Sequence, residues 1–362
     1  MVTIEEAVSP PPRRPCSDRF EECRNHAEDC SSNPGWMAVN CPDTCNYCHL
    51  RLSSDRCSRT GFLNVSNDAF LKPGDVTKIF KRIIAASSSS SSSSATGAAA
   101  ITVALSESEQ GAEGEPSLIT NVGTDIDKKI EKFIFNTEVL SQKPYILKFT
   151  NFLSESESNE ILDYSGISYE RSTGSSKSAN ELGEVNKLVD NIRTSASYWC
   201  KDLGCKSRDI VKKISDRIAS LGGGSGNGNG NNNGNALPPP ENWEPFQLLK
   251  YEEGEYYRSH HDYSADEIGL ACGPRIFTFF IYLSDVIEGG NTSFPLTSDN
   301  VSVLPKKGDA VLWSNVESKR PFSKDLRTTH EAKTVTKGTK FAMNIWMHMY
   351  NFEVSNKWAC CG

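Results

Sequence analysis

The chain of 362 residues lacks the features that mark several large classes of protein. No apolar run approaches the roughly 20 residues that a membrane-spanning helix needs, so no transmembrane segment is predicted. The formal net charge is −7 and Lys and Arg form no stripe, so a nucleic-acid partner is not expected. Residues 1–10 contain no apolar core of a signal peptide.

Cysteine, in contrast, is abundant, and six of the twelve cysteines fall within residues 16–48. A segment this short cannot bury enough apolar surface to fold alone, so disulfides and an oxidising compartment are expected. The polar N-terminus disagrees with secretion. We give the cysteines more weight and expect that the natural start is missing and that the protein resides in the endoplasmic reticulum lumen or secretory pathway.

Low-complexity segments predict how the chain is divided. Residues 1–15 are polar and Pro-rich and are predicted to be disordered. A Ser run opens a predicted flexible linker over residues 87–115, which is expected to separate the cysteine-rich head (16–48) and a short helical connector (49–86) from a larger domain (140–352). A Gly/Asn-rich insertion at 222–235 is expected to loop out of that domain.

Hydrophobic periodicity predicts a mainly β domain with supporting helices. Helices are expected over 67–84 and 208–221, and Ser154 and Glu157 form a capping box that opens another. The predicted strands span 146–152, 246–251, 256–262, 275–283, 301–304, 309–313 and 339–349. Many strands after a helical preface indicate an α+β fold whose sheets form a two-sheet jelly roll, the double-stranded β-helix.

Histidine is scarce, and one cluster of it points to a metal. Alternate strand residues share a face, so His260 and Asp262 can aim at one point while His261 faces away. A His and a carboxylate are two arms of the 2-His-1-carboxylate triad of non-haem iron oxygenases. Two other His lie in or beside the cysteine-rich head, so the residues leave His330 or His348 as the third ligand. Taken alone, such a triplet is more often a surface loop or a satisfied polar pair.

A second polar cluster lies on the last predicted strand. Lys340 opens an alternating run in which Lys340, Asn344, Trp346 and His348 share one face. A Lys at the start of a strand, beside a His, can hold an anionic co-substrate near a metal. The competing interpretation is a solvated strand end, which is the commoner environment of Lys.

Residues 144–350 resemble the catalytic domain of prolyl 4-hydroxylases, a family of Fe(II)/2-oxoglutarate dioxygenases. The matching blocks occur in the family's order and with its spacing. They are PYILKFTNFL (144–153), IRTS (192–195), FQLLKY (246–251), HHD (260–262), RIFT (275–278), YLSD (282–285), GGNTSFP (289–295), KGDAVL (307–312), His330 and Lys340. Asn291 departs from the Glu usual after the paired glycines, which puts one local hydrogen bond in doubt.

The resemblance implies a role for each site residue. It implies that His260, Asp262 and His330 bind Fe(II), and that Lys340 binds the far carboxylate of 2-oxoglutarate. It also implies hydrogen-bond donors to 2-oxoglutarate and contacts to the peptide substrate. These are Tyr251 and Thr292 for 2-oxoglutarate, Tyr257, Arg275 and His348 for the peptide, and Trp346 for the floor of its groove.

The resemblance further implies hydroxylation of proline in a Pro-rich, collagen-like or cell-wall-type polypeptide. Fe(II), 2-oxoglutarate, O2 and L-ascorbate would be required, with succinate and CO2 released. Two other functions remain open from the residues. One is a 2-oxoglutarate oxygenase that acts on another residue or a small molecule, and the other is a non-catalytic interaction protein that uses its head.

The head resembles an ShK-toxin-like module, which is expected to contact a substrate or partner. The resemblance implies the pairs Cys16–Cys48, Cys23–Cys41 and Cys30–Cys45, although sequence alone allows fifteen connectivities. A zinc site built from Cys45, Cys48 and His26 or His49 is the alternative.

The cysteines outside the head give weaker signals. Cys57 stands apart and could pair with a distant Cys, and Cys200 with Cys205 could be a local disulfide or two free thiols. The partners of Cys272, Cys360 and Cys361 are not predicted.

Overall fold

The computed structural model describes residues 16–88, 136–175, 180–182, 184, 187–188, 191–221 and 236–361. The N-terminal segment 1–15, the linker beyond residue 88 and the insertion 222–235 lie outside these ranges. None of the described helices combines the length and apolar character needed to cross a membrane.

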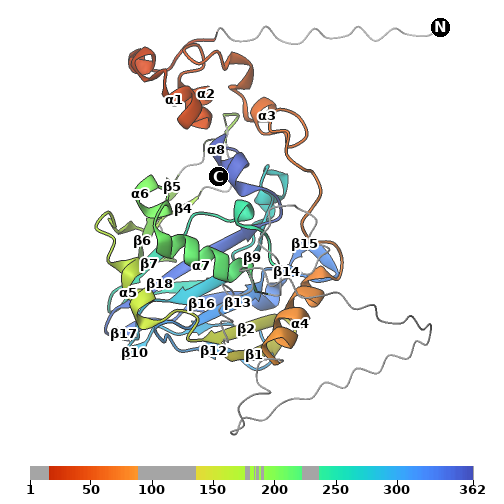
Figure 1. Ribbon diagram of the computed structural model, residues 1–362, viewed down its shortest axis with the longest axis vertical. Coiled ribbons are helices and arrows are strands. Elements are labelled where there is room, and N and C mark those ends of the chain that lie inside the picture. The colour runs from red at the N-terminus through yellow and green to blue at the C-terminus, as the bar shows by residue number, and fades with distance from the viewer. Residues whose placement is uncertain are drawn as a thin grey trace, which may run out of the picture.

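The larger domain contains two antiparallel sheets that face each other, with helices in front of the strands in the view of Figure 1. The larger sheet has eight strands. In spatial order they are β1 (Asn136–Gln142), β2 (Tyr145–Thr150), β13 (Ala310–Ser314), β9 (Arg275–Tyr282), β18 (Lys340–His348), β7 (Gln247–Tyr251), β6 (Ala196–Trp199) and β3 (Glu170–Arg171).

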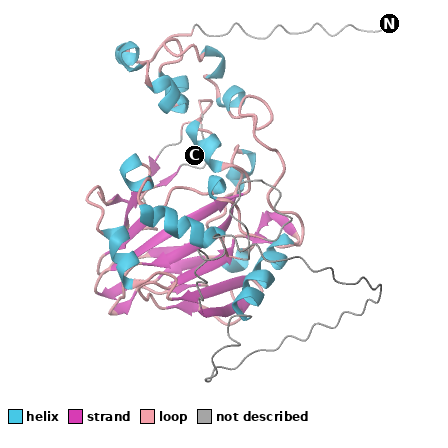
Figure 2. Cartoon of the chain, in the orientation of Figure 1, coloured by secondary structure: helices cyan, strands magenta, loops and turns pink. Residues whose placement is uncertain are grey.

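The smaller sheet has four strands, and three two-stranded pairs complete the β structure (Figure 2). The smaller sheet runs in the order β12 (Ser302–Val303), β11 (Thr292–Ser293), β16 (His330–Ala332) and β8 (Tyr257–His260). The pairs are β10 (Glu288–Gly289) with β17 (Val335–Lys337), β14 (Val316–Glu317) with β15 (Arg320–Lys324), and β4 (Gly174–Ser175) with β5 (Lys187–Leu188). The predicted mainly β fold with supporting helices is confirmed.

Alternating side chains divide the larger sheet into two apolar faces. On β9, Phe277, Phe279 and Ile281 belong to one buried cluster, whereas Phe280 and Tyr282 belong to the other. The first cluster is covered by helices. The second lies between the two sheets, where side chains of the smaller sheet complete it. A site built between the sheets is therefore surrounded by apolar side chains.

Helices cover the outer face of the larger sheet. Ser154 and Glu157 form the predicted capping box at the start of α5, each side chain bonded to the other's backbone N–H. In chain order, the described helices of the head and of the larger domain together are α1 (Asp29–Ser32), α2 (Pro34–Asn40), α3 (Ser53–Arg56), α4 (Asp75–Ser88), α5 (Glu155–Leu162), α6 (Leu203–Lys206), α7 (Asp209–Ala219) and α8 (Phe352–Lys357). Short 3₁₀ turns are η1 (Glu21–His26), η2 (Cys48–Leu50), η4 (Pro240–Asn242), η5 (Ala265–Gly269) and η6 (Leu326–Thr328).

Two predicted boundaries are wrong. The helix expected over 67–84 begins at Asp75, because Gly74 has φ +93°, a conformation that an α-helix cannot contain. The strand expected over 256–262 ends at His260, so Asp262 lies just beyond it rather than on it.

The Ser-rich stretch does not separate the head from the larger domain as expected. Helix α4 precedes that stretch, yet Ile79, Phe80 and Ile83 are buried in the core on the outer face of the larger sheet. The Phe80 ring stacks on Tyr145 of β2, with 5.0 Å between the ring centroids. Helix α4 is therefore part of the larger domain.

The head is held by three disulfides, which join the pairs that the ShK resemblance implies. They are Cys16–Cys48, Cys23–Cys41 and Cys30–Cys45. The zinc alternative is therefore wrong, because the sulfur atoms it needs are in disulfides. The other six cysteines also pair, as Cys57–Cys360, Cys200–Cys205 and Cys272–Cys361.

The core between sheet and helices predicts a large cost for removing one ring. Phe279 is fully buried and lies against Phe149 and Phe152, so Phe279→Ala should lower the free energy of unfolding by about 3–5 kcal/mol. Ile287→Ala is the control, because Ile287 is 73% exposed and its loss should cost less than about 0.5 kcal/mol. Urea unfolding under non-reducing conditions measures both, and equal costs would contradict the assignment of the core.

Candidate metal and anion site

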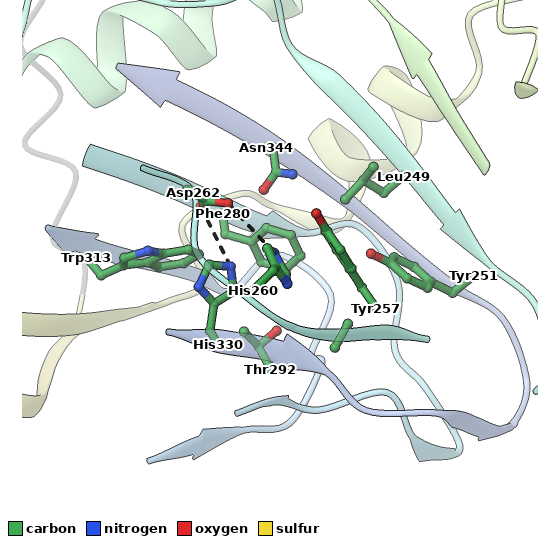
Figure 3. A pocket seen from close by; sticks show the side chains of 11 residues that line it. Leu249, Tyr251, Tyr257, His260, Asp262, Phe280, Thr292, Trp313, His330 and Asn344 are labelled. Carbon is green, nitrogen blue, oxygen red and sulfur yellow. Dashed lines mark ion pairs between the residues drawn. The ribbon is translucent and has the colours of Figure 1, made fainter. Parts of the chain in front are cut away.

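Two imidazoles meet across neighbouring strands of the smaller sheet. Strands β8 and β16 are antiparallel, and their register places His260 opposite His330. Asp262, two residues past His260, has its two carboxylate oxygens 3.7 Å from the Nε2 atoms of His260 and His330 (Figure 3). One potential ligand atom from each residue lies within 4.8 Å of the other two, so the three side chains can share one metal ion.

Backbone carbonyls fix which nitrogen of each imidazole faces the centre. Nδ1 of His260 lies 2.8 Å from the carbonyl oxygen of Arg258, and Nδ1 of His330 lies 3.0 Å from that of Thr328. A carbonyl only accepts, so each Nδ1 carries the proton and each Nε2 keeps its lone pair. In metal sites, a hydrogen bond from one ring nitrogen to a carbonyl fixes the tautomer and points the other nitrogen at the metal.

The carboxylate is oriented by a relay of two side chains in series, Thr278 on β9 and Asn315 just after β13. The Thr278 hydroxyl donates to Asp262 Oδ2 at 2.7 Å, and Asn315 Nδ2 donates to the Thr278 oxygen at 2.9 Å. Thr278 and Asn315 are fully buried, so the relay is rigid. Neither Thr278 nor Asn315 was predicted from the sequence. A Thr on an apolar strand gives no distinctive signal.

The charges at the centre suit a divalent metal. Burial lowers the pKa of His260 well below its ordinary value, so this imidazole is neutral at pH 7. Burial would raise the pKa of Asp262, but the adjacent imidazoles, which attract the carboxylate whenever they carry a second proton, and the hydrogen bond from Thr278 outweigh it and hold the pKa below its usual range. Neutral imidazoles with one ionised carboxylate are the donor set of the 2-His-1-carboxylate iron triad, so these residues fit Fe(II).

His261 is excluded from this centre, as predicted. Its Nδ1 accepts from the backbone N–H of Tyr263 at 2.9 Å, and its Nε2 lies 2.9 Å from the carbonyl oxygen of Asp325. Both ring nitrogens are therefore used on the opposite side of the chain from Asp262.

Lys340 is buried beside the same cavity. Its side chain is fully buried, and Nζ donates to the carbonyl oxygen of Gly290 at 2.7 Å. Nζ also lies 5.4 Å from the ring centroids of both Tyr251 and Phe280. Burial lowers the pKa of Lys340 to about 7. An ammonium in this position is costly unless it meets an anion, so the site is suited to bind one.

The predicted hydrogen-bond donors lie in the same wall. Tyr251 and Thr292 both line the cavity, and Lys340 is opposite Tyr251 in the pairing of β18 with β7. The Tyr282 hydroxyl donates to the Thr292 oxygen at 2.8 Å, which leaves the Thr292 proton available for a ligand. Tyr282 was not identified from the sequence.

The cavity joins the metal ligands to the anion end through mostly apolar and aromatic side chains (Figure 3). Its lining residues are Leu249, Tyr251, Tyr257, His260, Asp262, Phe280, Thr292, Trp313, His330, Ala332 and Asn344. The metal ligands and the Lys340 environment therefore belong to one site.

The residues predicted to contact a peptide divide into two groups. Tyr257 lies in the cavity and stacks on His260, with 3.4 Å between ring centroids, and burial raises its pKa to about 12. Arg275, Trp346 and His348 form a separate cluster at one end of β18 and β9. Their contact with a peptide remains a prediction.

Glu244, which the sequence analysis missed, organises the second group. It accepts from Arg275 Nε at 2.5 Å and faces His348 Nε2 at 2.8 Å. Burial would raise the pKa of Glu244, but Arg275 and His348 lower it to about 2. The Arg275 guanidinium lies 3.8 Å above the Trp346 ring. His348 is buried and its Nδ1 faces the carbonyl oxygen of Gly273 at 2.7 Å, so any effect on a bound peptide would pass through Glu244 and Arg275.

Comparisons with known proteins agree with this site. A family model described as the 2OG-Fe(II) oxygenase superfamily matches residues 246–348, and a model described as ShK domain-like matches residues 15–48. The Arabidopsis thaliana protein Probable prolyl 4-hydroxylase 8 is 33% identical over 236 residues, which cover 60% of this chain and 72% of that protein.

A second Arabidopsis protein and a solved structure are also similar to this chain. Prolyl 4-hydroxylase 5 of Arabidopsis thaliana is 30% identical over 243 residues, which cover 60% of this chain and 72% of that protein. A solved structure of the viral collagen prolyl hydroxylase of Paramecium Bursaria Chlorella virus-1, in its 2OG complex, is 21% identical with a TM-score of 0.41 and covers 57% of this chain and 97% of that one. The chain belongs to the prolyl 4-hydroxylase family of 2-oxoglutarate-dependent Fe(II) dioxygenases.

Proposed function

We propose that this chain is a peptidyl-proline 4-hydroxylase that acts on Pro-rich, collagen-like or cell-wall-type polypeptides and releases succinate and CO2. The observation that carries the proposal is Lys340. It is fully buried, it bonds only a carbonyl oxygen among the described hydrogen bonds, and it lies beside the cavity that contains the metal ligands. A dianion such as 2-oxoglutarate can reach both ends of such a site.

Each end of the cavity has a defined task. His260, Asp262 and His330 would hold Fe(II), and Lys340 with Thr292 would bind the distal carboxylate of 2-oxoglutarate. When bound, iron and 2-oxoglutarate activate O2 for insertion of oxygen into an unreactive C–H bond. The aromatic walls exclude water from the site, which strengthens the ion pair with Lys340.

The peptide would approach along aromatic and cationic side chains. Proline rings in polyproline II chains dock in aromatic-lined grooves. Tyr257 packs between His260 and Arg193. Trp346 lies under Arg275, so each of these two rings would border the peptide path together with a cation. The Arg275 guanidinium is partly exposed, so it can donate to a peptide carbonyl. These features favour a peptide over a small molecule.

The compartment and the reductant are also part of the proposal. All twelve cysteines are paired, which supports an oxidising environment such as the endoplasmic reticulum lumen. Ascorbate is proposed as the reductant that keeps the iron ferrous between turnovers.

A product assay tests the function. Purified protein with Fe(II), 2-oxoglutarate, ascorbate and a poly-proline or collagen-like peptide should yield succinate and 4-hydroxyproline in equal amounts, measured by mass spectrometry. His330→Ala should abolish both products, because it removes one of the three ligands. Succinate without oxidised peptide would favour an oxygenase that acts on another residue or a small molecule, and no succinate from iron-loaded protein would refute the proposal.

The Thr278 relay predicts a loss of metal affinity without loss of a ligand. Thr278→Val keeps the shape of the side chain but removes the hydrogen bond to Asp262, so the affinity for Fe(II) should fall about 10–100-fold. Anaerobic metal titration measures it. Thr336→Val is the matched control, because Thr336 is exposed on β17. The affinity of this variant for Fe(II) should equal that of the wild type.

The pKa of Lys340 predicts a pH dependence of co-substrate binding. Below pH 7 the free site holds an ammonium, and above pH 7 that ammonium loses its proton. The Kd for 2-oxoglutarate should therefore rise about tenfold per pH unit between pH 7 and 9, measured by calorimetry with Mn(II) in place of iron. Lys340→Arg stays charged and should bind with a Kd that does not change over this range. A flat wild-type profile would contradict the role of Lys340.

A further inference from the structure

Several contacts join the ShK-like head and the connector after it to the catalytic domain, and one of them is made by the buried cation Arg56. Arg56 is fully buried at the junction and donates to carbonyl oxygens in three separate segments. Nε donates to Trp358 at 2.7 Å, Nη1 to Leu50 at 3.0 Å and Arg51 at 2.9 Å, and Nη2 to Leu182 at 2.8 Å. The residue therefore joins the end of the head, the C-terminal region and the part of the chain around residue 182.

A second set of contacts reaches that same part of the chain. The Ser53 backbone N–H and hydroxyl both donate to the Glu181 carbonyl oxygen, at 3.0 and 3.1 Å. Arg19 Nη1 donates to Glu184 Oε1 at 2.7 Å and to Asn40 Oδ1, at the end of α2 in the head, at 3.1 Å. Residues 180–182 and 184, called here the docked segment, are thus bound at three points, one from the head (Arg19) and two from the connector that follows it (Ser53 and Arg56).

Covalent and apolar contacts fix the head in place. Cys57, next to Arg56, forms a disulfide with Cys360 after α8. The Trp358 ring is contacted edge-on by Tyr47 and Phe62, with ring centroids 5.5 and 4.5 Å apart. Figure 1 shows the head directly above α8 and the β4–β5 pair. The head is therefore held against the catalytic domain at its C-terminus as well as at the docked segment.

The docked segment lies between two stretches that border the cavity. In the chain it falls between β4 and β5, which pair with each other. Before β4, Ser172 bonds Ser195 through its backbone N–H at 2.9 Å. After β5, the Arg193 guanidinium lies 4.8 Å over the ring of Tyr257, which lines the cavity, and Thr194 bonds the backbone of Tyr256. In the chain, the docked segment thus falls within the excursion from Ser172 to Ser195, whose two ends bond each other, and Arg193 at the second end lies over Tyr257.

We infer that the ShK-like head is a positioning element for the peptide side of the active site, acting through Arg56 and the Arg19–Glu184 ion pair on the excursion that ends at Arg193. This rests on the proposed peptide hydroxylation. Lys340 and Thr292, which would bind the far carboxylate of 2-oxoglutarate, lie on β18 and β11 and are held by sheet pairing, so their positions do not depend on the head. Loss of docking should therefore weaken the use of the peptide and leave the use of 2-oxoglutarate unchanged.

A charge-swap experiment tests the inference in the full chain. Arg19→Glu and Glu184→Arg each turn an attraction between partly exposed groups into a repulsion, and each should raise the peptide KM about two- to fivefold with an unchanged KM for 2-oxoglutarate. The double variant, Arg19→Glu with Glu184→Arg, should restore the wild-type peptide KM. Arg320→Glu is the matched control, because Arg320 forms an exposed ion pair with Glu317 on a different hairpin.

A second measurement reads the docking directly. Hydrogen–deuterium exchange of backbone amides in residues 180–184 should be faster in each single variant and return to the wild-type rate in the double variant. Arg56→Lys, which retains the charge but loses the fork that reaches Leu182 and Trp358, should show the same faster exchange and about a tenfold higher peptide KM.

The outcomes separate this inference from the proposed function. Faster exchange with an unchanged peptide KM would overturn the positioning role, and so would a parallel change in kcat and both KM values, which would indicate general damage. Wild-type exchange in all three variants would show that the head does not hold the segment. A wild-type protein that releases succinate but oxidises no proline peptide would overturn the function instead, whatever the exchange pattern.

Discussion

The antiparallel register between β8 and β16 is the constraint on which the active site depends. It places His260 opposite His330, although the two residues are far apart in the chain. A slip of one residue would turn one imidazole to the other face of the sheet and destroy the centre. Strand β16 also pairs with β11, which carries Thr292, so one small sheet positions both the metal end and part of the anion end of the cavity.

The larger sheet contributes the buried cation and the hydrogen-bond donor of the site. Strand β18 brings Lys340 to the cavity, and β9 brings Thr278 to the carboxylate of Asp262. The Lys340 ammonium lies near the rings of Tyr251, Phe280 and Tyr282, and among the described contacts it hydrogen-bonds a single carbonyl oxygen. Burying an ammonium without a paired anion costs stability. Such a costly residue is typical of a ligand-binding site, where the ligand supplies the missing partner.

The sequence predicted the parts of the site that have a local pattern. The His-x-Asp triplet, the alternation after Lys340 and the capping box are short-range signals, and the family blocks singled out His330 from His348. Glu244, Thr278 and Tyr282 were missed because each acts on a partner distant in the chain. The place of α4 was missed for a related reason: periodicity predicts an apolar helix face but not the surface that it covers.

The two C-terminal cysteines link the chain just after the head to the catalytic domain. Cys360 is tied to Cys57 below the head, and the adjacent Cys361 is tied to Cys272, one residue before Gly273, whose carbonyl oxygen holds His348. The tail thus fixes both the head and the loop that borders the Arg275 cluster. The two metal-binding histidines and Lys340 lie on paired strands, whereas the Arg275 cluster, proposed to contact the peptide, lies next to a disulfide-bonded loop. On the proposed function, reduction of Cys57–Cys360 and Cys272–Cys361 would loosen the peptide side as well as the head, so an oxidising compartment would serve substrate recognition in addition to stabilising the head.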